Sequence, residues 1–580
     1  MEKEQLEHLR HSCAHLLAAA VLELYPDAKR TIGPAIENGF YYDFDMGDIK
    51  ISEADLAKIE EKMKVIAPTW SSFEREEVDK KSAEKVFADN EYKKELIAEF
   101  SSEGQKLTLY KSGNYVDLCR GGHSENPAKE LKHYKLLSLA GAYWRGKETN
   151  KMLTRIYGTC WPTKDELQKY LHMLEEAKKR DHRKLGKELD LFVFSDLVGS
   201  GMPLFTPKGA AVRSEIVNYS RELNKKIGFG EVHTPNINKG ELFKLSGHYD
   251  KYKDDMLMVK THYSEEEYFL KPMNCPQHTQ IYLSQPRSYK DLPIRYADFA
   301  NLYRDERPGE LAGLTRLRSF CQDDGHIFCR EDQIEQEFGN VLGVIKEALA
   351  TYGLNYYVRL SLGDAKQPEK YLGDITTWEK AETILRKLVK ENKIEFVEAT
   401  GEAAFYGPKM DIMAKDSLGR EWQISTIQLD LNMPTRFDLT YTDSDGEKKH
   451  PVMIHRALIG SPERFMGILL EHHAGALPVW LSPVQILFAP VGEAHIAGAE
   501  KLVKEFNIAG IRAEADSDSE SIGKKVRKAV GRKIPYVVVV GDRELAGDPW
   551  TIRVRGEEEQ IKLSGGDFRQ KILTEINNRK

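Results

Sequence analysis

The spacing of hydrophobic and polar positions divides the 580-residue chain into three segments. Up to about residue 181, helical patterns are interleaved with aromatic-rich strand patterns such as Phe40-Tyr41-Tyr42-Asp43-Phe44, which predicts an N-terminal α+β domain. Towards the end of this segment a strongly charged stretch, Lys164 to Leu189, predicts a helix that links two domains. Its basic residues fit a solvated helix face and an RNA contact equally well.

The other two segments differ in how strands and helices follow one another. From 182 to 479 the order is irregular, which predicts an α+β domain on an antiparallel sheet, with strands at 356–360 and 409–414 among others. After Pro478 strand and helix patterns alternate, which predicts a small doubly wound α/β domain. Its predicted strands are 484–490, 511–515, 536–541 and 551–555, and its predicted helices are 494–509 and 520–532. The expected domains are therefore 1–181, 182–479 and 480–580.

Composition and charge exclude extreme classes of protein without naming a function. Lysine and arginine number 85 and aspartate and glutamate 91, which gives a net charge of −6, so any RNA-binding surface must be a local basic face. A hydrophobic share of 41% is typical of a globular chain and too high for a disordered one. Six cysteines without a CxxC pair, a polar N-terminus and no apolar run of membrane length predict a cytoplasmic protein with no membrane partner.

Two short clusters of histidine and cysteine lie in the first segment. His11 and His15 are four positions apart, which places both imidazoles on one face of a helix, and the second cluster is the run from Asp117 to His123. A zinc protease needs a glutamate after its first histidine, and this chain has Ser12 there, so that interpretation is poor. Together the clusters predict a polar pocket, in which metal binding and metal-free activation of water both stay open.

Arginines gather in two later stretches. Between 299 and 330 a strand, a short loop and an antiparallel strand are expected to place several arginines on one side of a hairpin, where they could grip phosphate, or form a surface ion-pair ladder instead. These are Arg304, Arg316 and Arg318. Further on, Ser461-Pro462-Glu463 predicts the start of a helix, with the serine as its cap. Arg464 in the first turn opposes the helix dipole, which favours a functional role for this arginine.

Together these segments resemble the threonyl-tRNA synthetases, which are class II aminoacyl-tRNA synthetases. The three class II motifs fall at 228–235, whose proline lies at the dimer interface in this class, at Arg304 with Glu306, and at Arg464. The strings MNCPQH, CQDDGHIF, AFYGPKMD and PVMIHRALIGSPERF are specific to this family within the class. The resemblance implies a class II antiparallel-sheet catalytic domain between an N-terminal editing domain and a C-terminal α/β anticodon-binding domain. It also implies a homodimer that joins L-threonine to tRNA(Thr) at the expense of ATP.

The resemblance further implies one catalytic zinc ion per subunit, held by Cys275, His326 and His455. Their separations of 51 and 129 positions do not by themselves indicate a metal site. Such a set leaves zinc an open position, which the family uses to bind the amino and hydroxyl groups of threonine. Valine lacks that hydroxyl, but serine keeps it, and one missing methyl is worth only about 1–3 kcal/mol. A second site that hydrolyses mischarged seryl-tRNA is therefore expected.

This editing site is implied in the N-terminal domain, where a histidine would activate water without a metal. The residues that match it are His11, His15, Cys119 and His123 and, more weakly, Tyr42, Lys93 and Asp117. The family usually has proline at the position of Gly122, so the rigidity of this loop is expected to differ. Most bacterial members also begin with a small ubiquitin-like domain, which this sequence lacks.

For the synthetic reaction the resemblance implies that the threonine carboxylate attacks the α-phosphate of ATP, with arginines and Mg²⁺ neutralising the charge. The catalytic residues it implies are Arg304, Arg464 and Lys409. The implied ATP-binding residues are Arg304, Glu306, Arg316, Gln423, Thr426, Gln428, Ser461 and Arg464. The implied threonine-binding residues are Gln322, Asp324 and Tyr406.

For tRNA the resemblance implies anticodon contacts at Glu544 and Arg553. The basic residues between 524 and 533 fit phosphate contacts and a solvated helix face equally well. Where the family usually reads D-x-R-N-E-K-I-G, this chain has the run from Asp516 to Gly523, with Ser519 in place of the asparagine and without the basic residues. The details of anticodon contact are therefore expected to differ.

Three other functions are weighed against this one. A zinc hydrolase centred on His11 and His15 belongs to another enzyme class and predicts zinc in the first 180 residues. An RNA-binding regulator that keeps the fold without the chemistry is disfavoured by the conjunction of the arginines with the Cys/His/His set. A prolyl-type synthetase is the nearest alternative within the class, but it does not call for that set.

Overall fold

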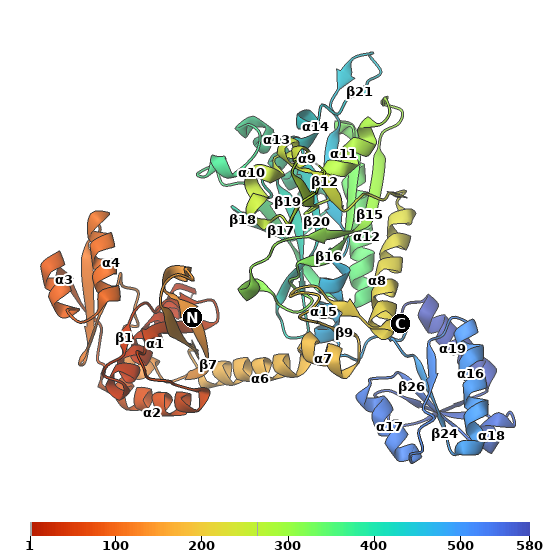
Figure 1. Cartoon of the computed structure of the whole chain (residues 1–580), viewed down its shortest axis with the longest axis horizontal. Helices are drawn as coiled ribbons and strands as arrows, with labels where there is room; N and C mark the ends of the chain where they lie inside the picture. The colour runs from red at the N-terminus through yellow and green to blue at the C-terminus, as the bar shows by residue number, and fades with distance from the viewer. Residues whose placement is uncertain (1–2, 264) are drawn as a thin grey trace. The chain divides into compact units, whose positions relative to one another are not determined.

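The computed structural model describes residues 3–263 and 265–580, which fold into two compact units, Met1–Glu175 and Glu176–Lys580. Each unit has its own buried cores, and Figure 1 shows the helices and strands of the whole chain. The three domains expected at 1–181, 182–479 and 480–580 remain a prediction, because this grouping does not decide between two and three. Among the described residues, no helix has both the length and the hydropathy needed to span a membrane.

The core of the first unit lies between two helices and an antiparallel sheet. Alternating aromatic residues in the predicted strand at 40–44 bury Phe40, Tyr42 and Phe44 in this core, which confirms that strand. The strand order is β1-β3-β8-β7, with β2 on the edge of β3, and α1 and α2 pack on the sheet. The elements are α1 (Lys3–Leu24), β1 (Lys29–Arg30), β2 (Ala35–Ile36), β3 (Gly39–Asp45), α2 (Leu56–Ile66), β7 (Tyr134–Tyr143) and β8 (Met152–Cys160).

A second, smaller antiparallel sheet in the first unit, in the order β4-β5-β6, carries the loop that matters for chemistry. Its elements are β4 (Glu74–Val78), α3 (Lys80–Val86), α4 (Glu91–Ser102), β5 (Leu107–Ser112) and β6 (Tyr115–Leu118). β6 ends immediately before Cys119, so the cysteine and the glycines after it leave the sheet together. Asp117 points inward from β6 and is 1% exposed.

The second unit is built around an eight-stranded sheet, in the order β11-β15-β16-β23-β20-β19-β17-β18. Its pairs are antiparallel except β11 with β15 and β17 with β18, which confirms the predicted antiparallel sheet. The strands are β11 (Gly230–Glu231), β15 (Ile294–Tyr303), β16 (Ser319–Cys329), β17 (Asn355–Leu362), β18 (Phe396–Thr400), β19 (Lys409–Lys415), β20 (Glu421–Asp430) and β23 (Val452–Ala457). The main helices against it are α8 (Pro207–Lys226), α12 (Ile334–Tyr352), α13 (Ile375–Glu391) and α15 (Pro462–His472).

The final hundred residues form the predicted α/β fold, with a mixed sheet in the order β25-β24-β26-β27-β28. The first three strands are parallel and the last two antiparallel, so the doubly wound pattern holds only in one half of the sheet. The fifth strand was not expected, because the alternation of Ile561, Lys562 and Leu563 is only three residues long. The elements are β24 (Ile486–Pro490), α16 (Ile496–Ile508), β25 (Ala513–Ala515), α17 (Ile522–Gly531), β26 (Tyr536–Val540), α18 (Asp542–Leu545), β27 (Trp550–Val554), β28 (Ile561–Leu563) and α19 (Gly565–Asn577).

The charged stretch expected to be one helix from Lys164 to Leu189 is two, α6 (Lys164–Arg180) and α7 (His182–Glu188). The break falls at Asp181, whose non-helical backbone lets its carboxylate accept the N–H of Arg183. Aspartate is a strong N-cap, so it ends one helix by starting the next.

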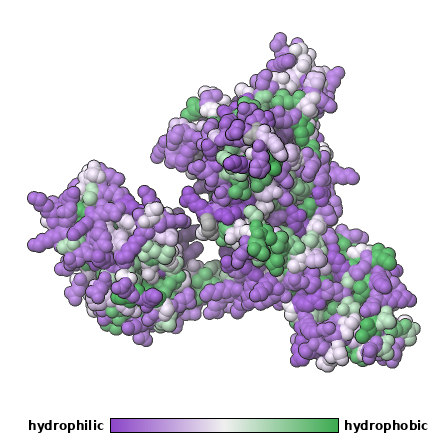
Figure 2. Space-filling view, viewed as in Figure 1, coloured by the Kyte–Doolittle hydropathy of each residue, from purple (hydrophilic) through white to green (hydrophobic). Residues whose placement is uncertain are grey.

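The face seen in Figure 2 is mostly hydrophilic, with a hydrophobic patch in the region of β9 (Phe192–Val193). Large hydrophobic side chains are exposed on β9 and in the residues that follow it, at Val193, Phe194, Leu197, Val198 and Leu204. Exposed hydrophobic patches of this kind are typical of interaction surfaces.

Candidate functional site

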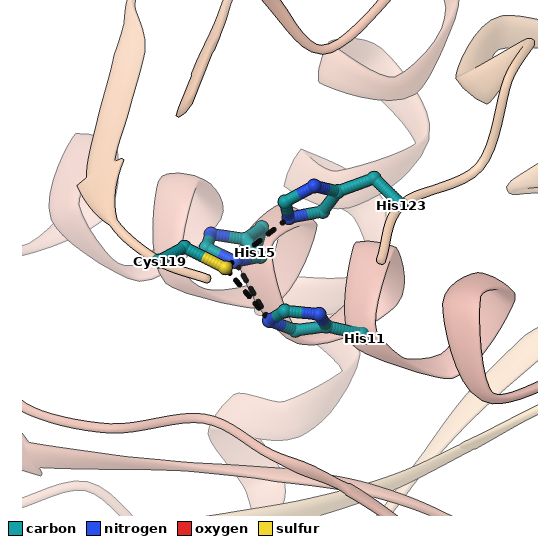
Figure 3. A group of neighbouring side chains, drawn as sticks. All are labelled: His11, His15, Cys119 and His123. Carbon is teal, nitrogen blue, oxygen red and sulfur yellow. Dashed lines mark hydrogen bonds between the residues drawn. The ribbon is translucent and has the colours of Figure 1, made fainter. Parts of the chain in front are cut away.

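Four predicted editing residues meet in the first unit (Figure 3). His11 and His15 lie one turn apart on α1, and Cys119 and His123 come from the loop after β6. His11 Nε2 lies 3.1 Å from His15 Nε2 and 3.4 Å from Cys119 Sγ, and Cys119 Sγ lies 3.6 Å from His123 Nε2. Three of the four, together with Tyr42, Lys93 and Asp117, line a cavity of about 620 Å³. The polar pocket predicted from the two clusters is therefore present.

A buried carboxylate organises the floor of this cavity. Asp117 accepts hydrogen bonds from the Tyr42 hydroxyl, the Tyr115 hydroxyl at 2.9 Å and Lys93 Nζ at 2.7 Å. The oxygen that accepts from Lys93, Oδ1, also lies 3.4 Å from Arg30 Nε, and the two tyrosine hydroxyls share Oδ2. Burial by itself would raise the pKa of Asp117, but the Lys93 and Arg30 cations outweigh it and hold that pKa below its usual range.

Two members of this network, Arg30 and Tyr115, were not expected from the sequence. Tyr115 precedes Asp117 by two positions in a strand, so the period of two already places both on one face. Arg30 comes from β1 and lies over the Phe87 and Tyr115 rings, a contact that only the fold creates.

The titrating groups of the cluster are held in uncharged forms. Burial lowers the pKa of His11, that of His15 well below its usual value and that of His123 to about 3, so all three imidazoles are neutral at pH 7. Burial also raises the pKa of the Cys119 thiol to about 11, which keeps it protonated and a poor nucleophile. His11 Nδ1 lies 3.1 Å from the carbonyl oxygen of Gly122, to which it donates, so Nε2 keeps its lone pair toward Cys119. The arrangement suits a general base better than covalent catalysis.

Gly122 has a backbone angle φ of +79°, and the preceding Gly121 one of +106°. Proline fixes φ near −65°, so a proline could not adopt this loop conformation. The exchange of proline for glycine therefore goes with a different path of the chain, and that path aims the Gly122 carbonyl at His11.

Acidification is expected to destabilise the first unit through these histidines. The pKa of His123 is lowered to about 3, against about 6.5 in an unfolded chain, so between these values only the unfolded state binds the proton. Stability is then complete above about pH 6.5 and falls by about 2 kcal/mol at pH 5 through His123 alone. Hydrogen exchange of α1 peptides between pH 7 and 5 measures this loss. His123→Gln should show a loss smaller by that amount, and an identical loss in both proteins would contradict the prediction.

A second cluster lies at the centre of the large sheet. His326 on β16 and His455 on β23 are directly paired across the two strands, and Cys275 begins α11 (Cys275–Leu283). Their ligand atoms all lie within 4.8 Å of one another, with His326 Nε2 at 3.0 Å from His455 Nδ1, and all three residues are buried. One thiolate and two imidazoles are a donor set that fits zinc with an open position.

Each histidine of this cluster is held by its other ring nitrogen. His455 Nε2 lies 2.9 Å from Asp430 Oδ2, and His326 Nδ1 lies 2.7 Å from His278 Nδ1. Partners of this kind fix the tautomer and the orientation of metal-binding imidazoles. His278 was not singled out in the sequence, although it is the last residue of the MNCPQH string and follows Cys275 by three positions on one helix.

Two adjoining cavities carry the remaining predicted residues. The smaller, about 130 Å³, is lined by the three cluster residues with Gln322, Asp324 and Tyr406. The larger, about 810 Å³, is lined by predicted ATP residues, which are Arg304, Glu306, Arg316, Gln423, Thr426, Gln428, Ser461 and Arg464. Arg304, Gln322, Thr426 and Gln428 line both cavities. Lys409 lines neither; its Nζ lies 2.7 Å from Asp411, which also binds Gln423 and Thr426.

The predicted hairpin and helix cap are both present, but one arginine differs from expectation. β15 and β16 pair from Ile294 with Phe328 to Tyr303 with Ser319, and the Ser461 hydroxyl accepts the N–H of Arg464. Arg318 does not line the larger cavity, because its Nε donates to the carbonyl of Glu306 at 2.9 Å. Arg316 lines it while paired with Glu306 at 2.8 Å, so this residue shows both an ion pair and a position facing the cavity.

The two predicted anticodon residues do not belong to either of the His/Cys clusters described above. Glu544 accepts the Gly541 N–H at 3.0 Å, as a helix cap, and Arg553 is exposed on β27. In the basic helix α17, Lys525 is 3% exposed and donates to the carbonyls of Pro490 and Asp516, so it is structural and not a phosphate contact. Lys528 pairs with Asp518 and Glu520.

Three family models match this chain. They are the tRNA synthetase class II core domain (G, H, P, S and T) over 258–473, the anticodon binding domain over 485–575, and the threonyl and alanyl tRNA synthetase second additional domain over 107–157. The last covers β5, β6 and the Cys119 loop.

Curated relatives match over the whole chain. The threonine–tRNA ligase of Rubrobacter xylanophilus is 48% identical over 100% of this chain and 90% of its own length. That of Thermotoga maritima is 46% identical over 100% of this chain and 89% of its own length.

Solved structures agree. The RNA binding domain of threonyl-tRNA synthetase from Cryptosporidium parvum Iowa II has a TM-score of 0.65 at 37% identity and covers 68% of this chain and 98% of that one. Prolyl-tRNA synthetase from Giardia lamblia, with a TM-score of 0.56, is only 17% identical over 70% of this chain and 81% of that one, so it supports the fold alone. The hydrolase, regulator and prolyl alternatives are all less well supported than the function of the full-length relatives.

Proposed function

Because this chain belongs to the threonine–tRNA ligases, it joins threonine to tRNA through a threonyl-adenylate, and we propose that its two adjoining cavities divide the adenylate step between them. The smaller cavity would hold threonine and the larger ATP. The observation that carries this proposal is that Arg304 lines both cavities, at the point where the threonine carboxylate would meet the α-phosphate.

In that step a carboxylate oxygen of threonine bonds to the α-phosphorus, the bond to the bridging oxygen breaks, and pyrophosphate leaves. Arg304 and Arg464 would neutralise the charge that develops, together with Mg²⁺ bound to ATP. Arg464 is suited to this because its Nε has no hydrogen-bond partner among the residues described, although it is nearly buried. Lys409 would act on the same cavity through Asp411, which holds Gln423 and Thr426.

Zinc is the metal we propose for Cys275, His326 and His455. When bound, it would supply a Lewis-acid site for the amino and hydroxyl groups of threonine. The chain itself orients the donors, since Asp430 and His278 hold the two imidazoles and the Tyr406 ring stacks on His455 at 4.7 Å between centroids. Gln322 and Asp324 would complete the threonine pocket.

The threonine pocket would also accept serine, because serine keeps the hydroxyl. The editing domain in the first unit hydrolyses the resulting seryl-tRNA. We propose that neutral His11, whose Nε2 lies 3.1 Å from His15 Nε2 and 3.4 Å from the Cys119 thiol, activates the water there. Lys93 and Tyr42, both hydrogen-bonded to Asp117, would lie beside the ester bond of the seryl-tRNA. Glu544 and Arg553 are proposed for the anticodon.

Three further properties are proposals of the same kind. The domains are 1–181, 182–479 and 480–580, and the location is cytoplasmic, which the six free cysteines support. A homodimer is supported by the exposed Pro235 and by the hydrophobic patch from Val193 to Leu204. Sedimentation equilibrium tests it, and a monomer at micromolar concentration would overturn it.

The test of the proposed function is ATP–pyrophosphate exchange with three amino acids. Threonine is expected to give the highest kcat/KM, serine a value lower by about 10–200-fold, and valine one lower by about 10⁴-fold or more, because valine leaves the hydroxyl-binding groups without a partner. Arg464→Ala should lose exchange with all three. Valine activated as well as serine would show that the smaller cavity does not read the hydroxyl.

A further inference from the structure

We infer that His182, the first residue of α7, is a positioning residue for ATP: it fixes the loop between Arg304 and Arg318 that forms one wall of the larger cavity. The inference rests on the proposed role of that cavity in binding ATP. No residue of α7 touches the cavity, so His182 would act through its neighbours.

The hydrogen bonds of His182 define its tautomer. The backbone N–H of Leu314 donates to His182 Nε2 at 2.9 Å, and a backbone N–H can only donate, so Nε2 carries a lone pair. The proton of the neutral ring therefore lies on Nδ1, which donates to Glu471 Oε1 at 2.6 Å. The same carboxylate oxygen accepts the backbone N–H of His182 at 3.0 Å. The ring is 5% exposed, so water cannot replace these partners easily.

The loop is pressed against this ring. Gly313 has a φ of +54°, and a Cβ at that position would come within 2.2 Å of His182 Nε2. Leu314 is 1% exposed and lines the cavity, as do Ala312, Thr315 and Arg316 on either side of it. A shift of the Leu314 backbone would therefore move the wall that carries Arg316.

The other side of the ring reaches two further walls. Glu471 lies in the last turn of α15, the helix whose first turn carries Arg464. Its second oxygen accepts from Arg420, which pairs with Asp416. Asp416 in turn accepts the indole N–H of Trp422, a lining residue of β20, at 2.9 Å. One imidazole thus joins the loop, α15 and β20, the three elements that contribute Arg316, Arg464 and Trp422.

Two variants separate the two hydrogen bonds. In His182→Asn the side-chain amide can occupy the position of Nδ1 and donate to Glu471, but it is too short to accept from Leu314. In His182→Gln the carbonyl can reach the position of Nε2 and accept from Leu314, without the donor at Nδ1. We expect His182→Asn to raise the KM for ATP about tenfold in pyrophosphate exchange, with the KM for threonine unchanged. His182→Gln should stay within about threefold of the wild-type KM for ATP.

The controls distinguish this inference from the function on which it rests. Absence of threonine-dependent exchange in the wild type would overturn the proposed function. With an active wild type, an unchanged KM for ATP in His182→Asn would overturn the role of His182 but not the proposed function. The same holds if the KM for ATP rises equally in both variants, in proportion to their loss of melting temperature. If His182→Asn does not fold, Gly313→Ala carries the test, since its methyl meets Nε2. A selective rise in the KM for ATP supports the inference, and an unchanged value overturns it.

Discussion

Cys275→Ala is expected to lose the bound metal and to lower threonine-dependent ATP–pyrophosphate exchange by at least about 10²-fold. Alanine removes one of three donor atoms that lie within 4.8 Å of one another, and the site is closed to a replacement because all three residues are buried. Mutation of a partner outside the ligand set already costs about 10–100-fold in metal affinity or activity, so a direct ligand costs more. Metal content after dialysis, measured beside exchange, checks both parts of the expectation.

Cys329→Ala is the matched control for this variant. Cys329 is a fully buried thiol on β16, the strand that carries His326, but it lies outside the ligand set. It should keep one equivalent of metal and near-normal exchange. Robust exchange by Cys275→Ala with no metal bound would refute a metal role in activation, whereas retained metal would mean that another residue replaces the thiolate.

His11→Ala is expected to lower seryl-tRNA hydrolysis by about 10²–10⁴-fold while leaving threonine activation within twofold of the wild type. The alanine removes the neutral base whose Nε2 faces Cys119, and the synthetic site lies in the other unit. Cys119→Ala should also lose hydrolysis, because it removes the thiol that lies 3.4 Å from His11 Nε2. Deacylation of purified seryl-tRNA(Thr) measures the loss directly.

His172→Ala is the control for editing, since it removes an exposed histidine of α6 within the same unit. Its hydrolysis rate should match that of the wild type. If His11→Ala also hydrolyses seryl-tRNA at the wild-type rate, the cluster is structural and the water must be activated elsewhere, for which Lys93 and Tyr42 would be the next residues to test.

Local patterns predicted the elements of this chain well, because each is decided by neighbours in sequence. The alternation at 40–44, the serine cap of α15 and the hairpin of β15 and β16 are all of this kind. The break at Asp181 was equally readable, since aspartate is a strong cap, but the density of charge around it suggested one continuous helix.

The Cys275, His326 and His455 cluster could be predicted only through resemblance, because its two histidines meet through the pairing of distant strands. His326 and His455 are 129 positions apart and become neighbours only when β16 pairs with β23. Residues such as His182 and Arg30, which hold the functional groups in place, carried no signal in a single sequence. Their importance lies in which atom of a neighbour they face, and spacing does not encode that.

The order of strands in the large sheet has a consequence for how this enzyme is made. β23 lies between β16 and β20, so it joins β11, β15 and β16 on one side to β20, β19, β17 and β18 on the other. It is also the last of the eight strands in the sequence, ending at Ala457. The strands on both sides of this position are therefore synthesised before β23, and until β23 exists the edges of β16 and β20 have no partner strand there. That strand also brings His455, so the three proposed metal ligands are complete only after it has been synthesised.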